Sequence, residues 1–237
     1  MWSPRCRRSN VWIAEVDGHT LVDLRRIQDL DGEGTPFARL AALLRKGEYR
    51  AAGIDAPFAL PARFMPRAKR PHARLLERVA MVPRRERVFP RGDDFAMAIA
   101  GTTRLDPPKP LRASEMEWQR RRVNVRSPLW CGARPGAPMT AACLTLLHEV
   151  KRPVWPFDDA NEGFLVEAFP SAQWVQWNGE LATHVDLQRW QRTVESNADA
   201  RDAVLAAFGA IAAATGALVS SPDPRVARIE GWVAVHR

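Results

Sequence analysis

The sequence has 237 residues, of which 46% are hydrophobic and 26% are charged, a globular composition with room for one large domain or two small ones. No apolar run approaches the roughly 20 residues of a membrane-spanning helix, and the basic start of the sequence lacks the apolar core of a signal peptide. The three cysteines are odd in number and widely spaced, which is not the pattern of a disulfide framework. We therefore expect a cytoplasmic protein and exclude membrane-spanning and disulfide-rich secreted classes.

The formal net charge is +8, and most of the positive charge is arginine. Two segments carry much of it, Arg63–Gly92 and Glu117–Ser127. Because guanidinium groups pair with phosphate in a bidentate geometry, these segments predict contacts with nucleic acid. A solvated basic face without a partner is the alternative interpretation. The candidate phosphate contacts are Arg70, Arg74, Arg122 and Arg126.

The N-terminal third predicts a hairpin, a helix and a strand in that order. Apolar residues alternate around Asp17-Gly18, a hairpin signal. Residues 35–49 have helical spacing, with Thr35 as the expected N-cap and proline in the first helical position. This order of elements favours an α/β fold.

Residues 51–61, read as AAGIDAPFALP, predict a buried strand closed by its two prolines. Asp55 lies in the middle of this apolar run. A buried carboxylate without a partner costs several kcal/mol, so Asp55 requires a hydrogen-bonding group, a cation or a metal ion.

The middle of the sequence, about 63–156, is rich in proline and arginine. We expect it to be an insertion in one domain that covers residues 1–237. Short helices are expected at 72–79 and 139–150, separated by a loop that glycine and proline punctuate.

The C-terminal third predicts a strand at 163–170, a helix at 197–216 and a final strand at 228–237. Glu167 lies in the first of these strands, just before a proline. The helix begins with Asp199 and Asp202, which favour its dipole, and is almost wholly apolar afterwards.

Three carboxylates therefore fall near strand ends or the start of a buried helix: Asp55, Glu167 and Asp202. Ligands of α/β sheets gather at the carboxyl ends of strands, so these acids could converge on Mg²⁺ or Mn²⁺. Paired ions at such a site assist phosphodiester hydrolysis. Each acid also has an ordinary explanation: bonds to backbone N–H groups for Asp55, an arginine partner for Glu167, and the helix dipole for Asp202 and its neighbour Asp199. The five histidines have no ligand spacing, and no glycine motif for a dinucleotide cofactor occurs.

Six short segments, spread from about Val11 to Trp232, form a specific combination: WIAE, GIDAPFALP, RSPLW…GAPMTAACLTLL, VEAFPSAQW, DARDAVLAAFGA and EGW. Together they resemble domain of unknown function family 429, a bacterial and archaeal family described as predicted RNase H-like nucleases. The resemblance implies a ribonuclease H-like fold, with a mixed central sheet flanked by helices. It also implies a metal-dependent nuclease in which Asp55 and Asp202 hold the metal with Asp199 as helper. Glu167 matches the acidic position of an E-x-x-P motif.

The sequence departs from the family pattern at its start. Family members open with a strand that carries a G-x-D motif, whereas this sequence opens with MWSPRCRRSN. The first strand and its acid are therefore expected to be missing, either because the start is placed too late or because the strand was lost. Two other functions stay open: a catalytically silent nucleic-acid-binding module, and an enzyme acting on a small phosphorylated substrate.

Overall fold

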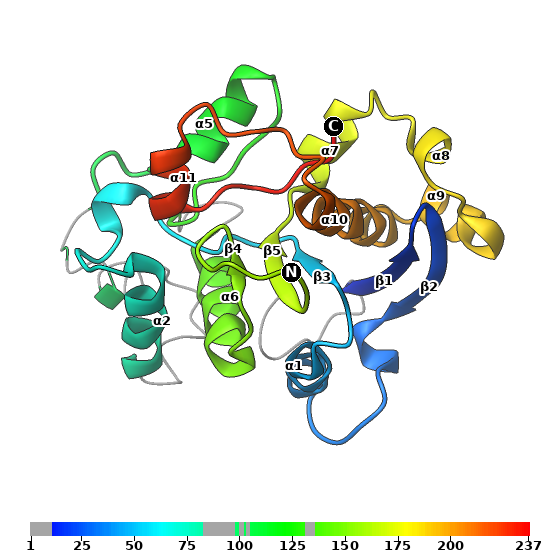
Figure 1. Cartoon of the computed structure of the whole chain (residues 1–237), viewed down its shortest axis with the longest axis horizontal. Helices are drawn as coiled ribbons and strands as arrows, with labels where there is room; N and C mark the ends of the chain where they lie inside the picture. Colours follow the sequence, from blue (N-terminus) through cyan, green and yellow to red (C-terminus); the bar gives the residue numbers. More distant parts are fainter. Residues whose placement is uncertain (1–10, 83–97, 100–101, 103–104, 131–135) are drawn as a thin grey trace. The chain divides into compact units, whose positions relative to one another are not determined.

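The computed structural model describes residues 11–82, 98–99, 102, 105–130 and 136–237 (Figure 1). The predicted α/β class is confirmed, because these residues form helices, a parallel sheet and an antiparallel sheet. The segment expected to lack the first strand, residues 1–10, lies outside the described residues, as does the part of the first basic segment from 83 to 92.

The chain divides into two compact units. Unit 1 comprises Met1–Asp55, Arg152–Ser220 and Val233–Arg237, and unit 2 comprises Ala56–Lys151 and Ser221–Trp232. The predicted insertion at about 63–156 overlaps the longer segment of unit 2.

The N-terminal hairpin is confirmed: β1 (Trp12–Asp17) pairs antiparallel with β2 (Thr20–Arg26). Gly18 and His19 form the turn, and Gly18 takes a left-handed φ of 58° that glycine adopts without strain. One side of the hairpin is apolar and packs on the core of unit 1, with Leu21 and Leu24 fully buried there.

The first helix, α1 (Pro36–Lys46), is also confirmed together with its cap. The Ala38 N–H donates to the Thr35 hydroxyl oxygen at 3.2 Å, which satisfies one of the unpaired N–H groups at the helix start. The Tyr49 hydroxyl donates to the Leu44 carbonyl oxygen at 2.7 Å, near the helix end.

The second sheet of unit 1 is parallel, with the strand order β3-β5-β4. Its strands are β3 (Ala51–Ile54), β5 (Phe164–Glu167) and β4 (Val154–Trp155). The prediction that β3 continues to residue 61 is wrong, because the chain leaves the sheet after Ile54 and its two prolines have no N–H for a ladder. Residues 56–61 are nevertheless buried, within unit 2.

The predicted C-terminal strand is wrong over its first part. Residues 224–230 form the helix α11 (Pro224–Glu230), which Asp223 caps by accepting from the Arg225 and Val226 N–H groups. Only isolated bridges follow among the described residues, at Ala234 and His236.

The longest helix, α10 (Ala198–Thr215), is confirmed, with Asn197 as N-cap and Gly216 in a left-handed conformation at its end. It packs against both β1 and β3, which belong to different sheets (Figure 1). Its contact with β3 is close because Gly53 has no side chain: a Cβ atom there would overlap the Ala206 carbonyl oxygen. The described residues of unit 1 also form the short α-helices α7 (Pro170–Gln176), α8 (Leu181–His184) and α9 (Gln191–Ser196).

Unit 2 is helical, and the helices predicted at 72–79 and 139–150 are confirmed. α2 (Pro71–Met81) packs against α6 (Ala137–Val150), and α5 (Ala113–Arg120) packs against α11. In the described part of the chain, no helix is long and apolar enough to cross a membrane.

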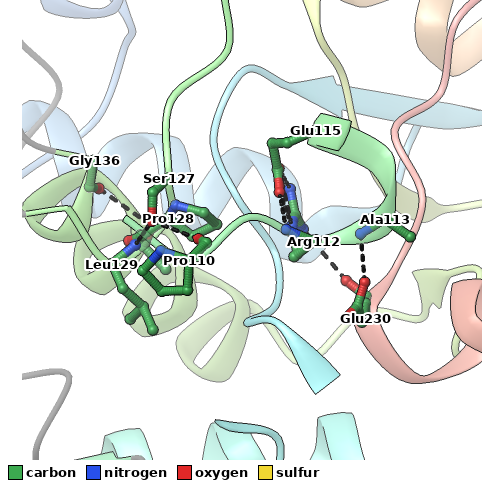
Figure 2. Close-up of polar contacts among 10 residues, drawn as sticks. Pro110, Arg112, Ala113, Glu115, Ser127, Pro128, Leu129, Gly136 and Glu230 are labelled. Carbon is green, nitrogen blue, oxygen red and sulfur yellow. Dashed lines mark hydrogen bonds and ion pairs between the residues drawn. The ribbon is translucent and has the colours of Figure 1, made fainter. Parts of the chain in front are cut away.

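A buried polar network joins the two segments of unit 2 (Figure 2). The Arg112 side chain is fully buried and donates to the Glu115 carboxylate and to the Glu230 carbonyl oxygen. The Glu230 carboxylate accepts from the N–H groups of Ala62 and Ala113, both at 2.6 Å. Each oxygen of this buried carboxylate therefore has a backbone donor, as buried polar groups require.

Candidate metal centre

Asp55 follows the last residue of β3, at the carboxyl end of the strand. Its side chain is exposed, so the expectation of a carboxylate buried within a strand is wrong. The reason is the early end of β3, which leaves Asp55 at the rim of unit 1. An exposed acid at a strand end is accessible to a hydrated cation.

The direction of α10 decides which of its ends lies near Asp55. Arg50 directly precedes β3, and its guanidinium donates to the carbonyl oxygen of Ala214, near the end of α10, at 3.1 Å. Gly53, near the end of β3, lies against Ala206, in the middle of the helix. The helix therefore runs antiparallel to β3, and its first turns lie at the end of the strand that Asp55 follows.

Asp202 lies one turn before Ala206, on the same face of α10, because residues four apart share a helix face. Gly53 lies on the face of β3 that α10 covers, and Asp55 follows two residues later, just past the end of the strand. Asp55 and Asp202 therefore lie toward the same end of unit 1.

Asp202 is partly buried, and burial raises the pKa of its carboxyl above the ordinary value. The Arg201 guanidinium opposes this shift of the pKa, and the Asp199 carboxylate adds to it. Asp199 is exposed in the first turn of α10, three residues from Asp202, so the two acids are neighbours on the helix surface. A cation bound beside them would offset both the burial and the repulsion.

Glu167 ends β5, and its Cα is paired with that of Ile54. Its side chain is 4% exposed. Val166 packs with Ala210 of α10, and alternation along the strand turns Glu167 to the other face of the sheet. The structure thus brings Asp55, Asp199 and Asp202 toward one end of unit 1, and it places the Glu167 side chain on the face of the sheet away from α10.

No three histidine, cysteine, aspartate or glutamate side chains of the described residues are close enough together to hold a metal ion by themselves. The residues that could contribute ligands are therefore Asp55 and Asp202, with Asp199 beside them. This number suits Mg²⁺, which is commonly held by one or two carboxylates, several waters and the phosphates of a substrate.

The four arginines predicted to contact phosphate all lie in unit 2 and are exposed. Arg74 pairs with Glu77 at 2.6 Å, a surface ion pair that leaves donors available for another anion. Arg70 directly precedes α2, and Arg122 and Arg126 follow α5. Their role in phosphate contact stays a prediction.

A cluster of histidines in unit 1 was missed by the sequence reasoning. The His184 ring stacks on Trp177 with centroids 4.1 Å apart, and His236 lies edge-on to the same indole at 5.9 Å. His19 Nδ1 lies 3.3 Å from the His184 carbonyl oxygen. Burial lowers the pKa of His184, and the charges of His236 and His19 lower it further against an opposing contribution from Glu180. The separation of 165 residues between His19 and His184 gives no local sequence signal.

Comparisons with protein-family models, with curated proteins and with solved structures find no match to this chain.

Proposed function

We propose that this chain is a metal-dependent nuclease that hydrolyses phosphodiester bonds in DNA or RNA, with Asp55 and Asp202 as ligands of Mg²⁺ or Mn²⁺. The observation that carries the proposal is the antiparallel packing of α10 on β3, which brings the two acids to the same end of unit 1. The charge of +8 favours a polyanionic substrate.

The proposed fold is RNase H-like. In that arrangement one mixed sheet runs behind the last helix. Here α10 packs against β1 and β3, although the two strands belong to separate sheets. A long helix that packs on strands of both sheets is compatible with an RNase H-like arrangement, which supports the proposal.

When bound, a divalent ion supplies charge stabilisation to the oxygens of the phosphodiester. Asp55 and Asp202 would contribute carboxylate oxygens to it, and the charge of Asp199 would strengthen cation binding. The exposed arginines of unit 2 are proposed as phosphate contacts of that unit, independent of the metal ligands. Glu167 was predicted to ligate a metal or orient a water. It has no role in the proposed mechanism, because its side chain lies on the face of the sheet away from α10.

The test is Mn²⁺ affinity, measured by electron paramagnetic resonance of free Mn²⁺. Asp55→Asn and Asp202→Asn are each expected to weaken binding on the order of tenfold or more, because each removes a charged ligand. Asp159→Asn is the matched control, since Asp159 is an exposed aspartate of unit 1 away from these residues along the chain. Equal affinity in all four proteins would refute the metal site.

Cleavage is then measured on labelled single-stranded, duplex and branched DNA, RNA and RNA–DNA hybrid. We expect Mn²⁺-dependent cleavage that EDTA and Asp55→Asn both abolish. Loss of cleavage on addition of excess unlabelled nucleic acid would identify nucleic acid as the substrate class. An enzyme that acts on a small phosphorylated substrate is expected to cleave none of these nucleic acids.

A second candidate is a nucleic-acid-binding module without catalysis. It is favoured by the absence of a three-acid group among the described residues. It predicts binding that weakens steeply with salt, because phosphate contacts release counterions, and no Mn²⁺-dependent cleavage.

A further inference from the structure

A pocket of about 700 Å³ opens beside the β1–β2 turn in unit 1. His19 of the turn lines it together with Gln191 and the segment 182–188. This volume falls within the roughly 300–1,000 Å³ of small-molecule sites. The pocket has room for a ligand the size of a nucleotide.

His184, which lines the pocket, has its ring packed against a buried aromatic residue. The His184 imidazole lies nearly parallel to the Trp177 indole, with 10° between the ring planes. Trp177 is itself 4% exposed and meets Phe208 edge-on at 5.0 Å. Trp177 thus holds one face of the imidazole, and His184 is a fixed surface on which a further planar ring can stack.

The rim supplies hydrogen-bonding groups from Asp186, Gln188 and Gln191, all exposed. Gln188 has a φ of 50°, uncommon for a residue other than glycine. Its backbone N–H donates to Asp186 Oδ1 at 3.2 Å, and its side-chain amide donates to Oδ2. A sparsely populated backbone conformation held by its neighbours is a feature that clusters at ligand sites.

We propose that this pocket binds a nucleobase, which stacks on the His184 ring and is hydrogen-bonded along its edge by the glutamine amides. Base–aromatic stacking accepts any base, whereas a glutamine amide pairs in a bidentate manner with N6 and N7 of adenine. The described residues that line the pocket include no lysine or arginine, so their chemistry suits a base and not a phosphate. The choice of a nucleobase over other planar ligands rests on the proposed function.

The experiment is calorimetric titration of the full chain, in EDTA, with adenosine monophosphate, with ribose 5-phosphate and with a single-stranded oligodeoxyadenylate. We expect binding of the ligands that carry a base and none of ribose 5-phosphate. His184→Ala is expected to weaken binding about tenfold through loss of the stack. His184→Phe retains a ring and is expected to bind within about threefold of the unchanged chain.

Gln191→Ala is a second variant, and it is expected to fold normally because Gln191 is exposed and its amide donates within its own helix, to Glu195. We expect it to weaken adenosine monophosphate about tenfold. His148→Ala is the matched control, since His148 is a half-exposed histidine of α6 in unit 2. It is expected to leave binding unchanged.

Binding of both base-carrying ligands identifies a site for free nucleotides, and binding of the oligonucleotide alone identifies a site for a base within a strand; both outcomes support the proposal. Absence of binding, or binding that neither His184→Ala nor Gln191→Ala weakens, overturns it. Because EDTA is present, Asp55→Asn must leave this binding unchanged. The proposed metal site and the proposed base site are therefore tested independently, and either proposal can be refuted without the other.

Discussion

Gly53 of β3 lies directly against the backbone carbonyl of Ala206 in α10, and no side chain separates the strand from the helix at this point. This contact sets how deeply α10 sits on the sheet. It also sets the position of Asp202, one turn away, relative to Asp55.

Gly53→Ala is expected to lower the free energy of unfolding by about 1–3 kcal/mol, because the added Cβ meets a backbone oxygen that cannot rotate away. Urea denaturation measures the change. Mn²⁺ affinity should fall in the same variant as α10 moves outward. The control is Gly216→Ala, where nothing lies within 4 Å of the added atom and the left-handed backbone alone costs about 1 kcal/mol. Equal destabilisation by the two substitutions would contradict the close contact.

Asp202→Asn is expected to stabilise the metal-free chain at pH 7 while it weakens metal binding. Burial raises the folded-state pKa of Asp202, so the folded chain favours the protonated form, and its contribution to stability is lost as pH rises from the ordinary value through the raised one. The amide of the variant does not ionise, so the variant does not lose this stability as pH rises. Thermal unfolding in EDTA at pH 3 to 7 measures it: the variant should gain stability over the unchanged chain as pH rises. A lower Tm for Asp202→Asn at pH 7 would show that the charged carboxylate is itself stabilising.

Tyr49 is the only tyrosine of the chain, so the ultraviolet absorbance of phenolate reports on it alone. Burial raises its pKa to about 12, against an opposing effect of Arg152. The neutral phenol therefore stabilises the folded chain, and this stability is lost as pH rises from about 10 through about 12. We expect the absorbance to change near pH 12 or together with alkaline unfolding, and near pH 10 in denaturant. A native chain that titrates near 10 would place the hydroxyl in water. Tyr49→Phe should cost about 1 kcal/mol through loss of the bond to Leu44.

Glu230→Gln is expected to lower the stability of the chain by about 2 kcal/mol, because a buried amide presents a donor where Ala62 or Ala113 needs an acceptor. Glu77→Gln is the comparison, since Glu77 forms an exposed pair with Arg74 and its loss should change stability by no more than about 0.5 kcal/mol. Guanidinium denaturation of the two variants distinguishes them. Similar small effects of both substitutions would mean that an amide can replace the Glu230 carboxylate in its bonds to Ala62 and Ala113.

The elements that could be predicted from the sequence are those whose signals are local. The Asp17-Gly18 turn and the Thr35 cap each act within a few residues, and both were read correctly. The α11 helix also had a local signal, Asp223 before Pro224, but its last residues were assigned to the strand predicted at 228–237.

The candidate site depended on contacts between distant residues, and the sequence predicted it less well. Asp55 was expected inside a strand, yet its exposure depends on where β3 ends. The approach of Asp202 to the same end depends on the direction of α10, which the Arg50–Ala214 bond and the Gly53 contact reveal. The histidine cluster around Trp177 had no sequence signal at all, because its members come from both ends of the chain and from α8.

The chain passes from one unit to the other four times, and the last crossings come within residues 221–237. Unit 2 lacks the Glu230 carboxylate until these residues are present. Unit 1 likewise lacks the paired bonds between the Gln173 amide and the His236 backbone. On a ribosome, neither unit can form its complete set of buried hydrogen bonds before residues 221–237 have been synthesised. A nascent chain that stops short of these residues would leave buried polar groups unpaired in both units at once.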